Sequence, residues 1–189
     1  MSSHHIVREN QEPALIIASL DELDREYLGQ LLEWSPSVFA DDYSLDFLLA
    51  ERIKVDFLIT EKALSPTVLQ EQISLIPLLN GLIPDALAYL IAHNYKAVNL
   101  LCREIPADIA TYAGAINIVL FLDGLRYVFV QDCYEKWKRA GDKVFVAEEL
   151  LKSLQGIRKI APNSFEVETD GFINLQFNTA DFVLIGEDI

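Results

Sequence analysis

Ionisable side chains stand just after apolar segments of the chain that have the character of buried strands. They are Asp41, Asp42, Glu61, Arg103 and Asp108. Ligands of open α/β sheets bind outside the carboxyl ends of the strands, so these groups are expected to meet at one sheet edge. Carboxylate oxygens and substrate phosphates are the ligands that Mg²⁺ prefers. The pattern is compatible with a site for Mg²⁺ and a polyphosphate, but the spacing alone favours the alternative, a set of solvated loop acids and helix caps.

Other chemistries lack their motifs. The sequence contains no GxGxxG, no Walker lysine loop and no GxSxG elbow. His4 and His5 lie near the start of the chain, and His93 is expected at a helix end, where a cation suits the helix dipole. Cys102 and Cys133 are far apart and outside any CxxC, so neither a disulfide framework nor a zinc site is expected.

Composition limits the partners. Of the 189 residues 51% are apolar, which is enough for a core, and the net charge is −14. A chain this acidic is expected to bind neither nucleic acid nor an anionic membrane surface. Its basic residues are interpreted as strand and turn positions: Lys136, Lys138, Arg139, Lys143, Lys152, Arg158 and Lys159. No apolar run reaches membrane-spanning length, and the predicted location is the cytoplasm.

Strands and helices alternate up to about residue 135. Continuous apolar runs predict strands at 13–19, 37–41, 55–60, 75–79, 97–102 and 116–123. Helices are predicted from 21 to before Pro36 and at 43–52, 66–73, 84–94 and 106–114. Because parallel strands are buried on both faces and read as continuous apolar runs, the pattern predicts a mostly parallel, Rossmann-like sheet with helices on both faces.

The pattern changes after the Asp123-Gly124 turn signal. Shorter strands are predicted at 126–131, 143–147, 164–168, 172–177 and 182–185. They predict a small antiparallel, β-sandwich-like domain. The chain is therefore an α/β protein with an expected α/β nucleotide-binding-like domain at 1–135 and a small all-β domain at 136–189.

One stretch resembles the thiamine pyrophosphokinase family. In that family a strand ends in Asp-Gly-Gly-Ala, and Ile-Lys-Pro-Asp then leads into a strand ending Gly-Asp-Phe-Asp-Ser. Asp42 falls on the Asp of the first motif, and the sequence from Ile53 to Asp56 matches the second with Val for Pro. Glu61 falls on the first Asp of the third motif, and Ala63 replaces its second Asp.

The resemblance continues along the chain. Ala86-Leu87 and Tyr95-Lys96 match the next helix and turn of the family, although Gly81-Leu82 replaces its Thr-Asp pair. Asp108 matches the Asp of an Arg-x-Asp-His loop whose glycines are absent here. The segment 137–146 resembles the entry to the family's C-terminal β-domain.

The resemblance implies an activity and a set of roles. The family transfers a pyrophosphoryl group from ATP to thiamine, giving thiamine diphosphate, with Mg²⁺. By resemblance Asp42 and Asp85 are the catalytic candidates, Asp42 and Glu61 the metal ligands, and Arg103 and Asp108 the cofactor-binding residues. The resemblance also implies a homodimer that forms through the C-terminal β-domain. It implies in addition that this domain is thiamine-binding-like.

The replacements bear on that activity. Phosphoryl transfer depends on positioning and on neutralising phosphate charge, and neither Ala63 nor Leu82 can hold a metal. The sequence therefore predicts a thiamine pyrophosphokinase-like protein with impaired or lost catalysis. The alternative is a non-enzymatic binding or dimeric interaction module that retains the fold.

Overall fold

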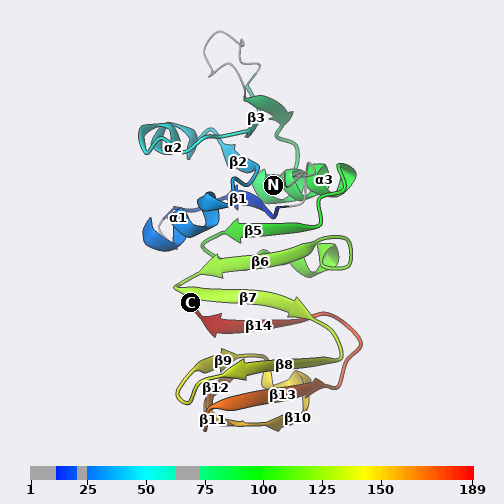
Figure 1. Ribbon diagram of the computed structural model, residues 1–189. Helices are drawn as coiled ribbons and strands as arrows, with labels where there is room; N and C mark the ends of the chain where they lie inside the picture. Colours follow the sequence, from blue (N-terminus) through cyan, green and yellow to red (C-terminus); the bar gives the residue numbers. More distant parts are fainter. Residues whose placement is uncertain (1–11, 21–24, 63–72) are drawn as a thin grey trace, which may run out of the picture.

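A computed structural model describes residues 12–20, 25–62 and 73–189 (Figure 1). The first part holds the strands β1 (Ala14–Ile17), β2 (Val38–Asp41), β3 (Phe57–Thr60), β4 (Ser74–Pro77), β5 (Ala97–Leu101) and β6 (Asn117–Leu122). Its helices are α1 (Arg25–Glu33), α2 (Leu45–Ala50), α3 (Leu82–Ala92) and a short 3₁₀ helix at Ile109–Tyr112. The predicted helix at 66–73 lies almost wholly outside the described residues.

The later part is built of strands. They are β7 (Leu125–Val130), β8 (Cys133–Lys138), β9 (Lys143–Phe145), β10 (Leu151–Gln155), β11 (Ile157–Ala161), β12 (Ser164–Val167), β13 (Gly171–Phe177) and β14 (Val183–Asp188). A second 3₁₀ helix, Glu148–Leu150, precedes β10. In the part of the chain that the structure describes, no helix is long and apolar enough to cross a membrane.

One mixed sheet runs through the molecule. Its order is β11-β12-β9-β14-β7-β6-β5-β1-β2-β3-β4, and the six strands from β6 to β4 are parallel. From β7 onward each neighbouring pair is antiparallel. Strand β1 lies between β2 and β5, so the strand order reverses at β1. In such sheets a ligand crevice is expected at that reversal.

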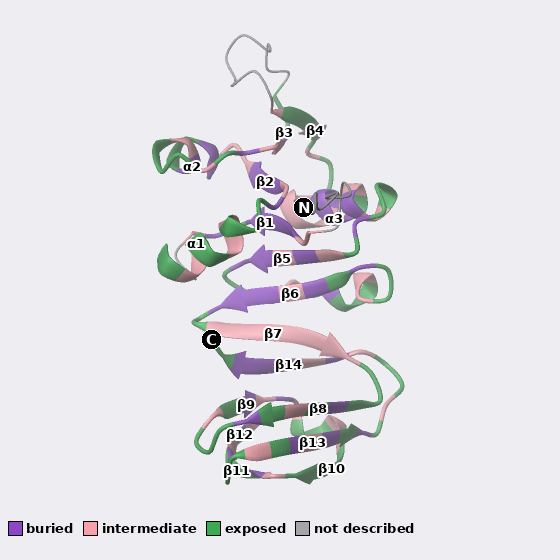
Figure 2. Ribbon diagram, viewed as in Figure 1, coloured by how far each residue is buried: buried purple, intermediate pink, exposed green. Residues whose placement is uncertain are grey.

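Alternate residues of the parallel strands enter two different apolar clusters. Ala14 and Ile16 of β1 belong to the cluster that contains Leu87 and Leu90 of α3. Leu15 and Ile17 belong to the cluster that contains Leu48 of α2 and Leu28 and Leu31 of α1. All four β1 side chains are fully buried, as Figure 2 shows for the middle of the sheet. Each buried Leu or Ile contributes about 1.5–3 kcal/mol, so these strands hold the loops at their ends rigidly.

A second sheet, β10-β13-β8, is antiparallel and packs on the last strands of the large sheet. A third apolar cluster joins them, with members from both sheets, including Leu175 of β13, Val144 of β9 and Ile185 of β14. In Figure 1 this sheet lies at the lower end of the molecule.

The α/β class and most strands agree with the sequence predictions. The α-helix predicted at 106–114 is wrong: Thr111 and Ala113 donate backbone hydrogen bonds three residues back, giving a single 3₁₀ turn. Strands β8, β10 and β11 are charged and were not predicted. The predicted domain boundary at 135–136 falls inside β8, and the large sheet continues across both parts. The division into two domains stays a prediction.

Candidate functional site

A pocket of about 510 Å³ opens at the carboxyl ends of β1, β2 and β5, where the strand order reverses. Its lining residues are Ala18, Ser19, Leu20, Arg25, Asp41, Tyr43, Ser44, Phe47 and Arg103. The volume suits a small organic molecule, since ligand sites typically span about 300–1,000 Å³. We call this hollow the switch-point pocket.

The loop after β2 is shaped by one carboxylate. Asp41 Oδ1 accepts hydrogen bonds from the backbone N–H of Tyr43 (3.1 Å) and of Ser44 (2.9 Å) and from Ser44 Oγ (2.8 Å). This Asx-type turn leads directly into α2. The Tyr43 side chain is left 97% exposed and that of Phe47 46% exposed, so aromatic surface stands at the pocket.

Two arginines line the same pocket from different elements. Arg103 Nε donates to Ser19 Oγ at 3.2 Å, which ties the loop after β5 to the loop after β1. The backbone N–H groups of Ala18 and Ser19 both donate to Leu101 O. Arg25, at the start of α1, forms an exposed ion pair with Glu51 at 3.0 Å. The pocket therefore presents guanidinium groups, which bind phosphate and carboxylate well.

Asp42 faces the end of β3. Its Oδ2 accepts a 2.6 Å hydrogen bond from the buried Thr60 hydroxyl, and Lys62 Nζ lies 3.5 Å from Oδ1. Asp42 and Lys62 line a separate, shallower hollow of about 310 Å³, in which Asp41 also takes part. Glu61, the neighbouring metal candidate, is exposed.

Asp85, in the first turn of α3, is buried and caps the turn that precedes the helix. Its carboxylate accepts backbone hydrogen bonds from Leu79 (2.7 Å), Asn80 (2.9 Å) and Gly81 (3.3 Å), and one from Asn80 Nδ2 (2.9 Å). Burial alone would raise the pKa of Asp85, but these hydrogen bonds outweigh it and hold the pKa below its ordinary value. Asp85 is thus engaged in closing the turn between β4 and α3.

Asp108 lies in a third hollow. It lines a space of about 430 Å³ together with Asn80, Pro84 and Tyr112, and its carbonyl accepts a hydrogen bond from the Thr111 hydroxyl at 2.6 Å. Of the residues predicted from the sequence, only Arg103 and Asp41 line the switch-point pocket.

The described side chains form no preassembled cage for Mg²⁺. Among the described residues no group of three His, Cys, Asp or Glu side chains is placed to hold a metal ion. Asp42 is already bonded to a hydroxyl and faces an ammonium group, which a divalent cation would have to displace. The predicted pairing of Asp42 with Glu61 around a metal ion therefore has no support in the arrangement of these side chains.

Sequence reasoning missed the other seven lining residues of the switch-point pocket, among them Ser19, Arg25, Tyr43 and Phe47. Ser19 could have been predicted, because it lies just after the end of β1, and the same rule picked out Asp41 at the end of β2. Arg25 could not, because its place depends on how α1 crosses the sheet edge.

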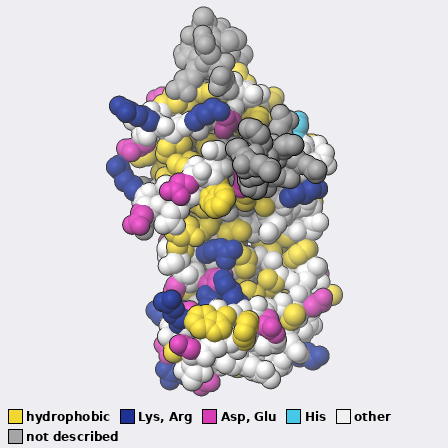
Figure 3. Space-filling model, in the orientation of Figure 1, with side chains coloured by type: hydrophobic (Ala, Val, Ile, Leu, Met, Phe, Trp, Pro, Cys, Tyr) yellow, Lys and Arg dark blue, Asp and Glu magenta, His cyan; other side chains and the backbone are white. Residues whose placement is uncertain are grey.

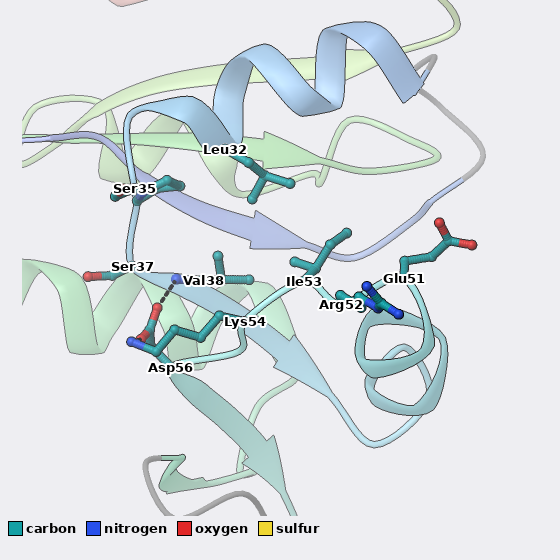
Figure 4. Close-up of a pocket in the computed structure, with 10 residues that line it drawn as sticks. Leu32, Ser35, Ser37, Val38, Glu51, Arg52, Ile53, Lys54 and Asp56 are labelled. Atoms are coloured by element: carbon teal, nitrogen blue, oxygen red, sulfur yellow. Dashed lines mark hydrogen bonds and ion pairs between the residues drawn. The ribbon is translucent and has the colours of Figure 1, made fainter.

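A further hollow, of about 460 Å³, lies at the opposite ends of the strands (Figure 4). There Asp56 Oδ2 accepts a hydrogen bond from the Val38 backbone N–H at 3.0 Å, and Asp56 Oδ1 pairs with Lys54 Nζ at 2.6 Å. Figure 4 shows Glu51 and Arg52 at its other side, where α2 ends. Because it faces the amino ends of β2 and β3, it is not where an α/β sheet is expected to bind its ligand.

Comparisons with known proteins define the fold. No family model matches the chain, and no curated protein matches it significantly. Yeast thiamin pyrophosphokinase superposes with a TM-score of 0.70 at 9% identity, covering 98% of this chain and 88% of that one. The Geobacillus thermodenitrificans enzyme gives 0.64 at 11% identity, covering 93% and 96%. A probable thiamine pyrophosphokinase from Staphylococcus saprophyticus gives 0.58 at 15% identity, covering 94% and 99%.

The chain is thus an α/β protein with a large mixed sheet and a pocket at its strand-order reversal. More particularly, it has the fold of the thiamine pyrophosphokinases, at a level of sequence identity that shows the fold alone.

Proposed function

We propose that this thiamine pyrophosphokinase-like chain binds a nucleotide-type ligand in the switch-point pocket. One observation carries the proposal: two arginines and two exposed aromatic rings line a single pocket at the strand-order reversal. Arg25 and Arg103 are suited to phosphate oxygens, and Tyr43 and Phe47 to the face of a base. ATP is the first ligand to test, because the fold relatives are thiamine pyrophosphokinases.

We further propose that pyrophosphoryl transfer to thiamine is impaired or lost. The two acids predicted to be catalytic are engaged elsewhere: Asp42 with Thr60 and Lys62, and Asp85 with the turn before α3. Leu82, in place of a motif Asp, cannot ligate a metal. In this proposal the parallel, Rossmann-like part with helices on both faces binds nucleotide. The antiparallel, β-sandwich-like part corresponds to the thiamine-binding unit, and the protein acts in the cytoplasm.

Thermal unfolding with ligands tests both statements. A ligand present at a hundred times its dissociation constant adds about 2.7 kcal/mol to the free energy of unfolding. We expect stabilisation by ATP with or without Mg²⁺, loss of most of it in Arg103→Gln, and no loss in the matched variant Arg158→Gln on β11. Thiamine diphosphate formation is measured in the same samples. Absence of any shift with ATP would refute the binding site, and turnover abolished by Asp42→Ala would refute impaired catalysis.

A dimeric interaction module is the second candidate, and one surface favours it. Trp137 of β8 and Phe172 of β13 are cross-strand partners, 50% and 70% exposed. Such an aromatic pair on the outer face of β8 and β13 suits a homodimer through the C-terminal part. Light scattering at micromolar concentration should give twice the mass of one chain, and the Trp137→Ser variant should give a lower mass. Trp34→Ser, which changes another exposed tryptophan, is the control. A monomeric wild type would exclude this candidate.

A further inference from the structure

A buried carboxylate between the two sheets is surrounded by cations. Glu187 of β14 is 2% exposed. Its Oε1 accepts from Arg126 Nη1 of β7 at 2.8 Å, and Lys136 Nζ of β8 lies 2.7 Å from Oε1 and 2.8 Å from Oε2. Lys138 Nζ, also from β8, contacts Oε2. We call Arg126, Lys136 and Lys138 the basic cluster.

The charges in this place do not balance. One cation would neutralise Glu187, yet three contact it, and the described residues give these three cations no second acidic partner. The four contacts also occupy the lone-pair positions of the carboxylate, while each ammonium and guanidinium retains N–H groups beyond those used. A protein with a net charge of −14 therefore holds a local surplus of two positive charges.

Tyr134 is an independent observation at the same place. Tyr134, Lys136 and Lys138 alternate along β8 and so project from the same face, toward β7 and β14. Tyr134 is 8% exposed, and its buried hydroxyl makes no hydrogen bond of normal geometry. Burial and the neighbouring charge of Glu187 raise the pKa of the phenol, which keeps it a proton donor. Tyr134 thus adds a buried donor beside Glu187, which three cations already contact, so hydrogen-bond donors outnumber acceptors at this place.

The basic cluster is open to solvent on one side. The Arg126 and Lys136 side chains are 33% and 42% exposed, whereas Lys138 is 9% exposed. Figure 3 shows basic side chains with an acidic one among them on the visible face, between the upper and lower parts of the molecule. An anion can therefore reach Arg126 and Lys136 without separating the sheets.

We infer that the basic cluster binds a phosphate group through Arg126 and Lys136, with Lys138 and Glu187 holding them in place. Two surplus positive charges match a doubly charged oxyanion, and guanidinium and ammonium groups are the usual phosphate donors. This site shares no residue with the switch-point pocket and goes beyond the proposed nucleotide site. The phosphate group is either inorganic phosphate or the phosphate of a monoester.

Calorimetric titration of the full chain tests the inference. Sodium phosphate and glycerol 3-phosphate are the two probes, each compared with sodium chloride at equal ionic strength. Binding of phosphate with the ester excluded assigns the site to the inorganic ion; binding of both assigns it to phosphate esters as well. Heat no greater than that of chloride for either probe overturns the proposal.

Matched variants locate the binding. Lys136→Gln should weaken phosphate binding by about tenfold or more, because a hydrogen bond to a charged group is lost. Arg126→Gln should act in the same way, and Lys152→Gln, at an exposed lysine of β10, should leave the affinity unchanged. If Arg103→Gln removes binding and Lys136→Gln does not, the anion occupies the switch-point pocket, and the basic cluster is not its site.

Discussion

Two buried carboxylates, Asp85 of α3 beside the parallel half of the large sheet and Glu187 of β14 in its antiparallel half, are stabilised by opposite means. Asp85 in the parallel half is held by neutral donors, three backbone N–H groups and one amide. Glu187 in the antiparallel half is held by three charged side chains. The neutral donors satisfy the hydrogen bonds of Asp85 and add no positive charge. The three cations around Glu187 carry more positive charge than its single carboxylate neutralises. Asp85 therefore stabilises a turn, whereas Glu187 lies at the centre of a cluster with surplus positive charge.

Of the substitutions that test this comparison, Glu187→Gln should lower the free energy of unfolding the most. The change leaves three cations together with no acid, and removing one partner of a buried ion pair costs about 3–5 kcal/mol. Urea unfolding measures the loss. Glu168→Gln, at an exposed acid before β13, is the control and should change stability little. A loss no larger than that of the control would mean that Glu187 does not neutralise the cluster.

Asp85→Ala should have a smaller but clear effect. It leaves the N–H groups of Leu79, Asn80 and Gly81 without their acceptor, at a cost of about 1–3 kcal/mol. Asp46→Ala, which removes an exposed acid from the first turn of α2, is the matched control. If stability is unchanged but ligand turnover disappears, Asp85 acts in catalysis, as the family resemblance implies.

Acidification should weaken both halves. In the folded chain the pKa values of Asp85 and Glu187 lie below their ordinary values of 3.8 and 4.5; in Glu187 the hydrogen bonds from Lys136 and Lys138 outweigh burial. The stabilisation is present above these ordinary values and is lost as the pH falls through the folded pKa values. The free energy of unfolding should therefore decrease below about pH 4.5, with a shallower decrease in Glu187→Gln. A pH-independent profile would contradict this.

Arg25→Gln should have the smallest effect on stability. The Arg25–Glu51 pair is 83% and 37% exposed, and such pairs contribute less than about 1 kcal/mol. The same change should weaken ATP binding, because Arg25 lines the switch-point pocket. A large loss of stability with unchanged ATP affinity would show that Arg25 is structural.

The sequence predicted the parallel strands well because each is a short run of buried apolar residues. Strand β8 escaped prediction for a physical reason. Two of its inward positions are Lys136 and Lys138, so the apolar alternation that marks a strand is absent. Those lysines point inward because Glu187, about fifty positions later in the chain, lies opposite them, and no local pattern reveals such a pair.

The candidate site was predictable in position but not in membership. The rule that ligands lie at the carboxyl ends of strands led to the sheet edge that holds the switch-point pocket. It could not tell that Asp42 turns toward Thr60 and Lys62, because that depends on how β2 and β3 lie side by side. Nor could it tell that the turn at Asn80 folds back onto Asp85.

The place of β14 has a consequence for synthesis of the chain. Strand β14 is the last described strand along the chain, and it pairs with β7 on one side and with β9 on the other. A nascent chain still lacking it would expose the edge of β7, and open strand edges promote aggregation. Truncation before residue 183 is therefore expected to yield insoluble protein.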